Sequence, residues 1–219
     1  MPVVLEIRPP KKHLCAVLLD TDFLPTDAPT DSYGNLLLDS DYCDEIHLKA
    51  AQRFSDDELE ELVKESERRR AKSRALWLLS RQNYCSGALL KKLCAVFSEE
   101  AAQYATARMC ELKLIDDQAY AQRLAEAMIC EKGIAPKRAP YLMAAKGVDL
   151  QLAKEVVQSR EDDPRVQIAE IIERKYLPKI RDPKGAERTV AALQRKGFSW
   201  SDIRAVMQKY SEEIDEFGE

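Results

Sequence analysis

The stretch LKLIDDQAYAQRLAEAMICEKGIAPKRAPYLMAAKGV, residues 112–148, holds a full set of helix start and stop signals. Asp116 can cap a helix, because its carboxylate accepts hydrogen bonds from the free N–H groups of a first turn. The apolar residues after it recur every four positions, as on one helix face: Tyr120, Leu124 and Met128. Gly133 suits the left-handed conformation that ends many helices. The stretch therefore predicts a helix that begins at Asp116 and ends at Gly133.

A second helix is predicted directly behind the first. Pro136 would open it, since proline is tolerated in a first turn, and Gly147 would end it. Pro140 should kink or shorten it, because proline cannot donate a backbone hydrogen bond. A third helix is expected from Asp149. Lys113 lies at the end of the preceding helix, where a lysine would cost about 1 kcal/mol in a left-handed conformation, unless the cap has another geometry.

The same pattern recurs along the chain. Phe97-Ser98, Val148-Asp149 and Phe198-Ser199 each place an apolar residue before a helix cap, and they are spaced about fifty residues apart. A period of this length with three helices per period is typical of a helical repeat. Asp163-Pro164 and Asp182-Pro183 have the form of helix starts in the last repeat.

The first fifty residues differ in character. Short runs rich in Val and Leu at 3–7, 14–19 and 36–38 predict strands, with a turn at Arg8–Lys12 between the first two. These strands should lean on the helix that begins at Ser55, where Ser55 and Glu58 form a capping box. We expect that helix to break near residue 66, because its apolar stripe is interrupted there.

The predicted fold is mainly α, with tandem three-helix repeats forming an elongated arc behind a small N-terminal β-containing region. The expected divisions are an acidic β-rich region 1–54, a connecting helix 55–67, repeats 68–115, 116–162 and 163–210, and an acidic tail 211–219.

These motifs resemble the RecX family of bacterial recombinase regulators. In the middle repeat the matching pieces are Ile115-Asp116-Asp117, Tyr120-Ala121, Lys132-Gly133, Pro136 with Arg138 and Met143, and Lys146-Gly147-Val148. In the flanking repeats they are Arg74-Ala75-Leu76, Leu79-Ser80-Arg81, Leu89 to Leu93, Leu193, Lys196-Gly197-Phe198-Ser199 and Ile203. The resemblance covers about two thirds of the chain.

The resemblance implies a non-enzymatic regulator without a cofactor. Proteins of this family bind the RecA recombinase filament on single-stranded DNA and modulate it, usually as inhibitors, in DNA repair and the SOS response. Such a protein would act as a monomer, with at most weak binding to free DNA. The alternative is a helical DNA-binding protein or transcription regulator of helix-turn-helix type, but the acidic net charge of −4 favours the first interpretation.

The charge is unevenly distributed. Residues 1–62 carry fourteen acids and five bases, whereas residues 64–96 carry nine bases and two acids. Such segregation is common on solvated helices, but it can also mark a basic docking surface. The candidate filament- and DNA-binding residues are Arg70, Arg74, Lys91, Lys92, Lys132, Lys137, Arg138, Lys146, Lys184, Arg188, Arg195 and Lys196.

Other chemistry finds little support in the sequence. Nucleotide-binding glycine loops, the GxSxG motif and the HExxH motif are absent, and the two histidines, His13 and His47, have no ligand-spaced partner, so we expect neither an enzyme nor a metal site. The six cysteines form no CxxC pair and predict reduced, mostly buried thiols. Trp77, Trp200, Phe97 and Phe198 have the spacing of core residues and not of base-stacking platforms. An opening segment without a signal peptide and a chain without a long apolar run predict a cytoplasmic protein.

Overall fold

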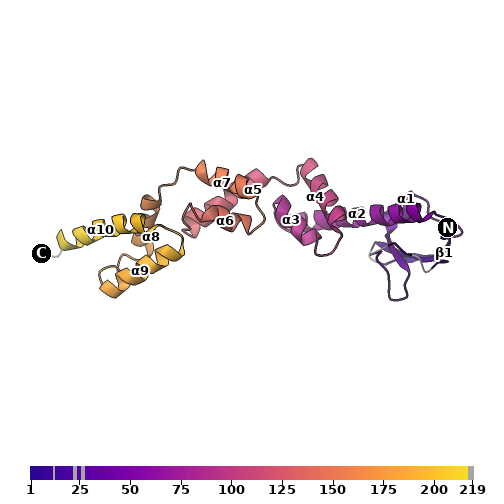
Figure 1. Cartoon of the computed structure of the whole chain (residues 1–219), viewed down its shortest axis with the longest axis horizontal. Coiled ribbons are helices and arrows are strands. Elements are labelled where there is room, and N and C mark those ends of the chain that lie inside the picture. The colour runs from indigo at the N-terminus through magenta and orange to yellow at the C-terminus, as the bar shows by residue number, and fades with distance from the viewer. Residues whose placement is uncertain (12, 22–23, 26–27, 217–219) are drawn as a thin grey trace. The chain divides into compact units, whose positions relative to one another are not determined.

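The computed structural model describes residues 1–11, 13–21, 24–25 and 28–216, and it is mainly helical with one small N-terminal sheet, as predicted (Figure 1). It divides into two compact units, Met1–Ile115 and Asp116–Glu219. The first unit contains β1 (Val4–Lys11), β2 (Leu14–Leu19), β3 (Leu36–Asp39), α1 (Ser40–Glu45), α2 (Asp56–Arg81), α3 (Ser86–Leu93) and α4 (Glu99–Glu111). The second contains α5 (Asp117–Glu126), the π-helix η1 (Ala127–Glu131), α6 (Ala139–Ala144), α7 (Leu150–Gln158), α8 (Pro164–Lys175), α9 (Pro183–Arg195) and α10 (Trp200–Glu216).

The three strands form an antiparallel sheet in the order β1-β2-β3. The expected turn after residue 7 is wrong, because β1 continues to Lys11. The strand accommodates both prolines of this segment because it is an edge strand with an irregular register between Arg8 and Lys11, where proline removes no essential ladder bond. Lys12, the last residue of the predicted turn, lies outside the described residues.

The sheet shares its core with the first half of α2, as expected from its small size. Its buried face, which includes Val17 and Leu36, packs with Leu59, Leu62 and Val63 of α2. A three-stranded sheet alone buries little apolar surface, so these helix residues complete the core. The predicted capping box at the start of α2 is confirmed, with both reciprocal bonds between Ser55 and Glu58 present.

The predicted break near residue 66 is wrong, because α2 is one continuous helix of 26 residues. Ser66 is 1% exposed, and its Oγ accepts a hydrogen bond of 2.7 Å from the backbone N–H of Asp39 at the end of β3. A buried polar residue with a partner can therefore occupy a core position, and the interruption of the apolar stripe is not a helix end.

The α-helices after α1 fall into three consecutive groups of three, α2–α4, α5–α7 and α8–α10, and they pack mainly within their own group. The three predicted apolar-plus-cap steps begin α4, α7 and α10, where Ser98, Asp149 and Ser199 each accept a bond from a first-turn N–H. The proline-containing starts of α8 and α9 are also confirmed. The spacing of caps thus predicted the helix starts correctly.

Left-handed residues end the helices where the sequence predicted. Lys113 has φ 55°, and the N–H groups of Lys113 and Leu114 donate to the carbonyls of Cys110 and Met109, as in a Schellman motif. Gly133 and Gly147 have φ values of 63° and 96°. Lysine therefore tolerates the conformational cost at this position because two backbone hydrogen bonds offset it.

The predicted helix start at Pro136 is wrong. Residues 136–138 form a turn, and α6 begins at Ala139 with Pro140 in its first turn. Proline at position 140 has no N–H to donate to the carbonyl of Pro136, so a helix through both residues would lack that bond. The expected shortening of the helix by Pro140 is confirmed, since α6 has six residues.

The prediction of buried cysteines is correct for Cys15, Cys43 and Cys85. It is wrong for Cys94 and the other two, Cys110 and Cys130, which are exposed. Each exposed cysteine lies in or next to a helix, at a position that the packed helices leave uncovered. Periodicity alone did not resolve this difference, because cysteine is equally compatible with the edge of an apolar stripe.

We predict that Ser66→Ala lowers the free energy of unfolding of the first unit by about 1–3 kcal/mol, because the buried N–H of Asp39 loses its acceptor. Chemical denaturation followed by circular dichroism measures the change. Ser73→Ala is the matched control, since Ser73 is an exposed serine of the same helix and its loss should cost less than about 0.5 kcal/mol. Equal effects of the two substitutions would contradict the proposed role of Ser66.

Candidate functional site

The arginines in the first half of the α2 basic run are engaged in ion pairs. Arg68 contacts Glu61, Glu65 and Glu100, and Arg69 contacts Glu45 and Glu65. The carboxylates raise the pKa of both guanidinium groups, which stay charged in any case. Because these charges are already neutralised locally, Arg68 and Arg69 contribute little to an interaction with another molecule.

Arg70 lies differently from the exposed candidates. Its guanidinium carbon is 5.7 Å from the ring centre of Phe97, and burial lowers the pKa of its side chain. It follows Ser66 by one helical turn and continues the polar interruption of the apolar stripe. This position favours packing of the α2–α4 group as the main role of Arg70.

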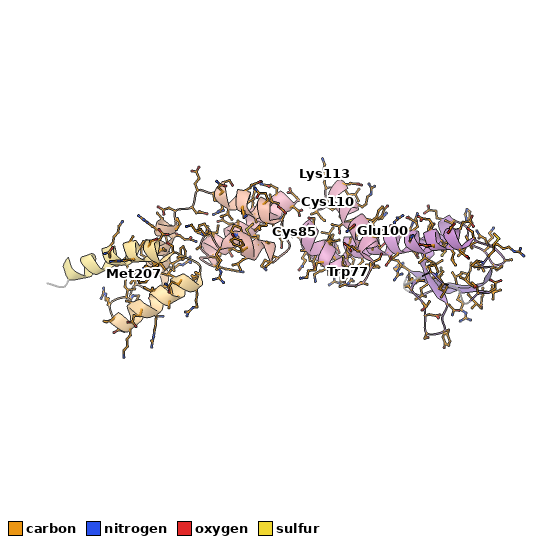
Figure 2. All side chains as sticks on the ribbon, in the orientation of Figure 1. Trp77, Cys85, Glu100, Cys110, Lys113 and Met207 are labelled. Atoms are coloured by element: carbon orange, nitrogen blue, oxygen red, sulfur yellow. The ribbon has the colours of Figure 1, made fainter. Side chains whose placement is uncertain are left out.

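The second half of α2 carries an exposed stack of two arginines and an indole. The guanidinium carbons of Arg74 and Arg81 lie 4.2 Å and 4.6 Å from the ring centre of Trp77. Figure 2 labels Trp77 on this helix group. The core-packing prediction is wrong for Trp77 and for Trp200, which are 44% and 57% exposed, but correct for Phe198, which is 5% exposed.

Trp77 and Arg81 were missed as candidates although the sequence contained the signal. Residues 74, 77 and 81 follow a spacing of three and four, which places them on one side of a helix. The apolar character of tryptophan suggested the core, but the inward positions of this segment are filled by Ala71, Ala75 and Leu78. Lys91 and Lys92 lie in the last turn of α3 with exposed side chains.

Five candidates of the second unit are brought together at two adjoining turns. We call them the turn cluster: Lys132, Lys137, Arg138, Arg195 and Lys196. The backbone N–H of Ala135 donates to the carbonyl of Lys196 at 3.0 Å, which joins the turn before α6 to the turn after α9. The two turns come from consecutive helix groups, so the sequence separation of about sixty residues concealed their proximity.

Two members of the turn cluster hold the turns together. Arg138 donates from Nη1 to the carbonyl of Arg195, and Lys196 donates from Nζ to the carbonyl of Lys132. Partial burial and the nearby charges of Lys175 and Arg174 lower the pKa of Lys196. These two side chains therefore have a structural role in addition to their charge.

Three members have exposed side chains that make no such hydrogen bond among the described residues: Lys132, Lys137 and Arg195. Lys137 lies close enough to Asp202 to help lower the pKa of that carboxyl, after the larger effects of the Ser199 hydroxyl and Arg165. The cluster is thus basic but includes an ionised carboxylate at its edge.

The remaining candidates lie elsewhere on the second unit. Lys184 and Arg188 are exposed and four residues apart on α9, so they share one side of that helix. Lys146 is exposed in the turn that follows α6. The structure therefore unites five of the twelve candidates in the turn cluster and distributes the others over α2, α3, α9 and the turn after α6.

The geometry of the candidate residues supports a role in binding. Among the described residues, no group of three or more His, Cys, Asp and Glu side chains could hold a metal ion. No helix in the described part of the chain is long and apolar enough to cross a bilayer. Exposed cations and an exposed indole can contact phosphates, carboxylates or aromatic rings, which are properties of an interface.

Comparison with known proteins identifies the family. No family model matches the chain. The regulatory protein RecX of a Thermus thermophilus strain is 33% identical over 124 residues, which cover 57% of this chain and 80% of that protein. The chain belongs to the RecX family. The RecX of Trichlorobacter lovleyi is 29% identical over 141 residues, which cover 62% of this chain and 92% of the relative.

Solved RecX structures share the fold of this RecX-family chain. One crystal structure of regulatory protein RecX gives a TM-score of 0.60 at 19% identity and covers 95% of this chain and all of that one. The RecX of Lactobacillus salivarius gives 0.56 at 21% identity, over 65% of this chain and 96% of that one. The resemblance inferred from the motifs is confirmed, and this RecX-family chain has a regulatory role.

We predict that Gly197→Ala destabilises the turn cluster. Gly197 has φ 94°, and an added Cβ would lie 2.7 Å from Cβ of Arg138. The substitution should cost about 1 kcal/mol for the left-handed backbone and about 1–3 kcal/mol more for the clash. Urea unfolding followed by circular dichroism measures the sum.

Gly34→Ala separates the two costs. Gly34 also has a positive φ, 80°, but a Cβ added there would have no atom within 4 Å. It should therefore lose only the backbone contribution of about 1 kcal/mol. Losses of equal size at the two glycines would show that the contact with Arg138 does not constrain position 197.

Proposed function

We propose that this chain binds a RecA-type recombinase filament on single-stranded DNA and lowers the activity of the recombinase. Membership of a family of regulatory proteins named RecX supports the regulatory part. The observation that supports the binding part best is the turn cluster, which gathers basic residues from two helix groups at two adjoining turns of the second unit. We further propose three repeats, 68–115, 116–162 and 163–210, with α2 running unbroken from the connecting segment 55–67 into the first repeat.

Charge favours a composite target over free DNA. The net charge is −4, and fourteen acids lie in residues 1–62, so free DNA is repelled by part of the molecule. A filament presents phosphates together with protein side chains, including carboxylates. Exposed lysines of the turn cluster can contact either the phosphates or the carboxylates of the filament. The acidic residues of segment 1–62 can contact basic side chains of the filament protein.

Some members of the turn cluster hold the two turns together, so only the others are suitable for testing this proposal by substitution. Charge reversal of Arg138 or Lys196 would remove hydrogen bonds that join the two turns, so lost binding could reflect a disturbed fold. Lys132 and Lys137 have exposed side chains, and reversing exposed charges changes folding stability little. These two lysines are therefore the better test positions.

We predict that the double variant Lys132→Glu, Lys137→Glu binds a recombinase filament about tenfold more weakly at low salt, because two favourable charge contacts become repulsive. The difference should shrink as salt rises, since exposed charges are screened. Fluorescence anisotropy of a labelled chain, titrated with filaments on single-stranded DNA, measures binding. Inhibition of strand exchange should fall in parallel.

Lys154→Glu, Lys209→Glu is the matched control. It makes the same change in net charge at two exposed lysines of the second unit that lie on α7 and α10, outside the turn cluster. It should bind filaments nearly as well as the unchanged chain. If both double variants bind filaments equally weakly, the effect comes from net charge alone and the turn cluster has no specific role. Tight, salt-sensitive binding of the unchanged chain to duplex DNA would favour a helix-turn-helix regulator instead.

A further inference from the structure

The stack of Arg74, Trp77 and Arg81 on α2 has features that core packing does not explain. The indole is 44% exposed, and both guanidinium groups lie within 5 Å of its ring centre. The three residues lie on one side of the helix, with Arg74 and Arg81 about 10 Å apart along its axis. We call them the arginine–tryptophan stack.

The stack lies in a segment without acidic residues. From Arg68 to Ser98 the sequence contains eight bases and no acid. The nearest acids on α2 are already engaged, because Glu65 contacts Arg68 and Arg69, and Glu67 accepts bonds from Ser98. Among the described residues, Arg74 and Arg81 have no carboxylate within ion-pair distance.

A ligand for this surface must satisfy both the charges and the ring. Single-stranded nucleic acid does so, because each nucleotide combines a phosphate with a base whose flat face is free to stack. In a duplex the base faces are occupied by neighbouring bases. An acidic protein surface would pair with the arginines but leave the indole without a matching partner.

We propose that the arginine–tryptophan stack is a binding site for an unpaired base of single-stranded nucleic acid. The base stacks on the indole or between the indole and a guanidinium group, and the arginines contact the flanking phosphates. This site goes beyond the proposed function, because it acts on a bare strand and needs no recombinase. It also lies in the first unit, whereas the turn cluster lies in the second.

Fluorescence provides a direct test, because the chain has only two tryptophans. In a Trp200→Phe background, Trp77 is the sole indole and reports stacking. Titration with an oligothymidylate of about 16 nucleotides should quench its emission, whereas an abasic strand of equal length should bind more weakly and quench little. A duplex of the same length should also quench little.

Substitutions distinguish stacking from charge. Trp77→Ala should weaken binding of the oligothymidylate about tenfold, equivalent to about 1.4 kcal/mol, with the salt dependence unchanged. Trp77→Phe should restore part of the affinity. Arg74→Gln with Arg81→Gln should lower the slope of log affinity against log salt by about 0.7 for each lost phosphate contact. These variants are measured by anisotropy of a labelled strand.

Leu76→Ala is the matched control, since Leu76 is the adjacent exposed apolar residue of α2, at 41% exposure. It should leave binding unchanged, and thermal melting should show that every variant is folded. Quenching that is equal for the abasic strand, or unchanged affinity in Trp77→Ala, would overturn the proposal. Polyglutamate that competes as well as the oligothymidylate would assign the stack to an acidic protein partner instead.

The two proposals fail in different experiments. Loss of filament binding in Lys132→Glu, Lys137→Glu with normal quenching of Trp77 would support the turn cluster and leave the stack intact. Normal filament binding in Trp77→Ala, together with weakened binding to the bare strand, would support the stack alone.

Discussion

The fold depends on turns that end each helix at a defined residue, so that the next helix can pack back against it. The residues that adopt the left-handed conformation after a helix include Lys113, Gly133, Gly147 and Gly197. At a left-handed position the chain reverses while the last carbonyls of the helix still receive hydrogen bonds. Short helices cannot be stable alone, so the groups α2–α4, α5–α7 and α8–α10 exist because these turns bring their apolar faces together.

The same turns create the candidate binding surface of the second unit. Gly197 has no side chain, and Arg138 occupies the space that a side chain would take. Arg138 can then donate to the carbonyl of Arg195, and Lys196 to that of Lys132. These hydrogen bonds hold the basic residues of two helix groups close together, although their like charges repel one another. Structural and binding roles are divided within one cluster, and the exposed lysines carry the binding role that we propose.

Helix α2 shows a comparable division along its length. Its first half uses Ser66 and paired arginines to attach the sheet and α4, so its polar residues serve the fold. Its second half has arginines without acidic partners in the described part of the chain, and they lie against an exposed indole. The acid-free segment after Glu67 is the physical reason for this difference, since no local carboxylate neutralises the charge.

The sequence by itself determined most helix starts and most helix ends, because caps and left-handed turns act through neighbouring atoms of the chain. Ser55, Ser98 and Asp149 cap helices as their local sequence predicted, and Lys113 adopts the left-handed one of the two cap geometries that the sequence left open. It also carried the family resemblance, since that rests on the order and spacing of the same signals.

The tertiary structure alone decided which polar residues are buried and which basic residues meet. Ser66 looked like a helix break because its partner, the N–H of Asp39, lies 27 residues away in the chain. Trp77 looked like a core residue because its exposure depends on how alanines beside it fill the inner face. The turn cluster could not be predicted, because Lys132 and Lys196 are 64 residues apart and only packing between two helix groups brings them together.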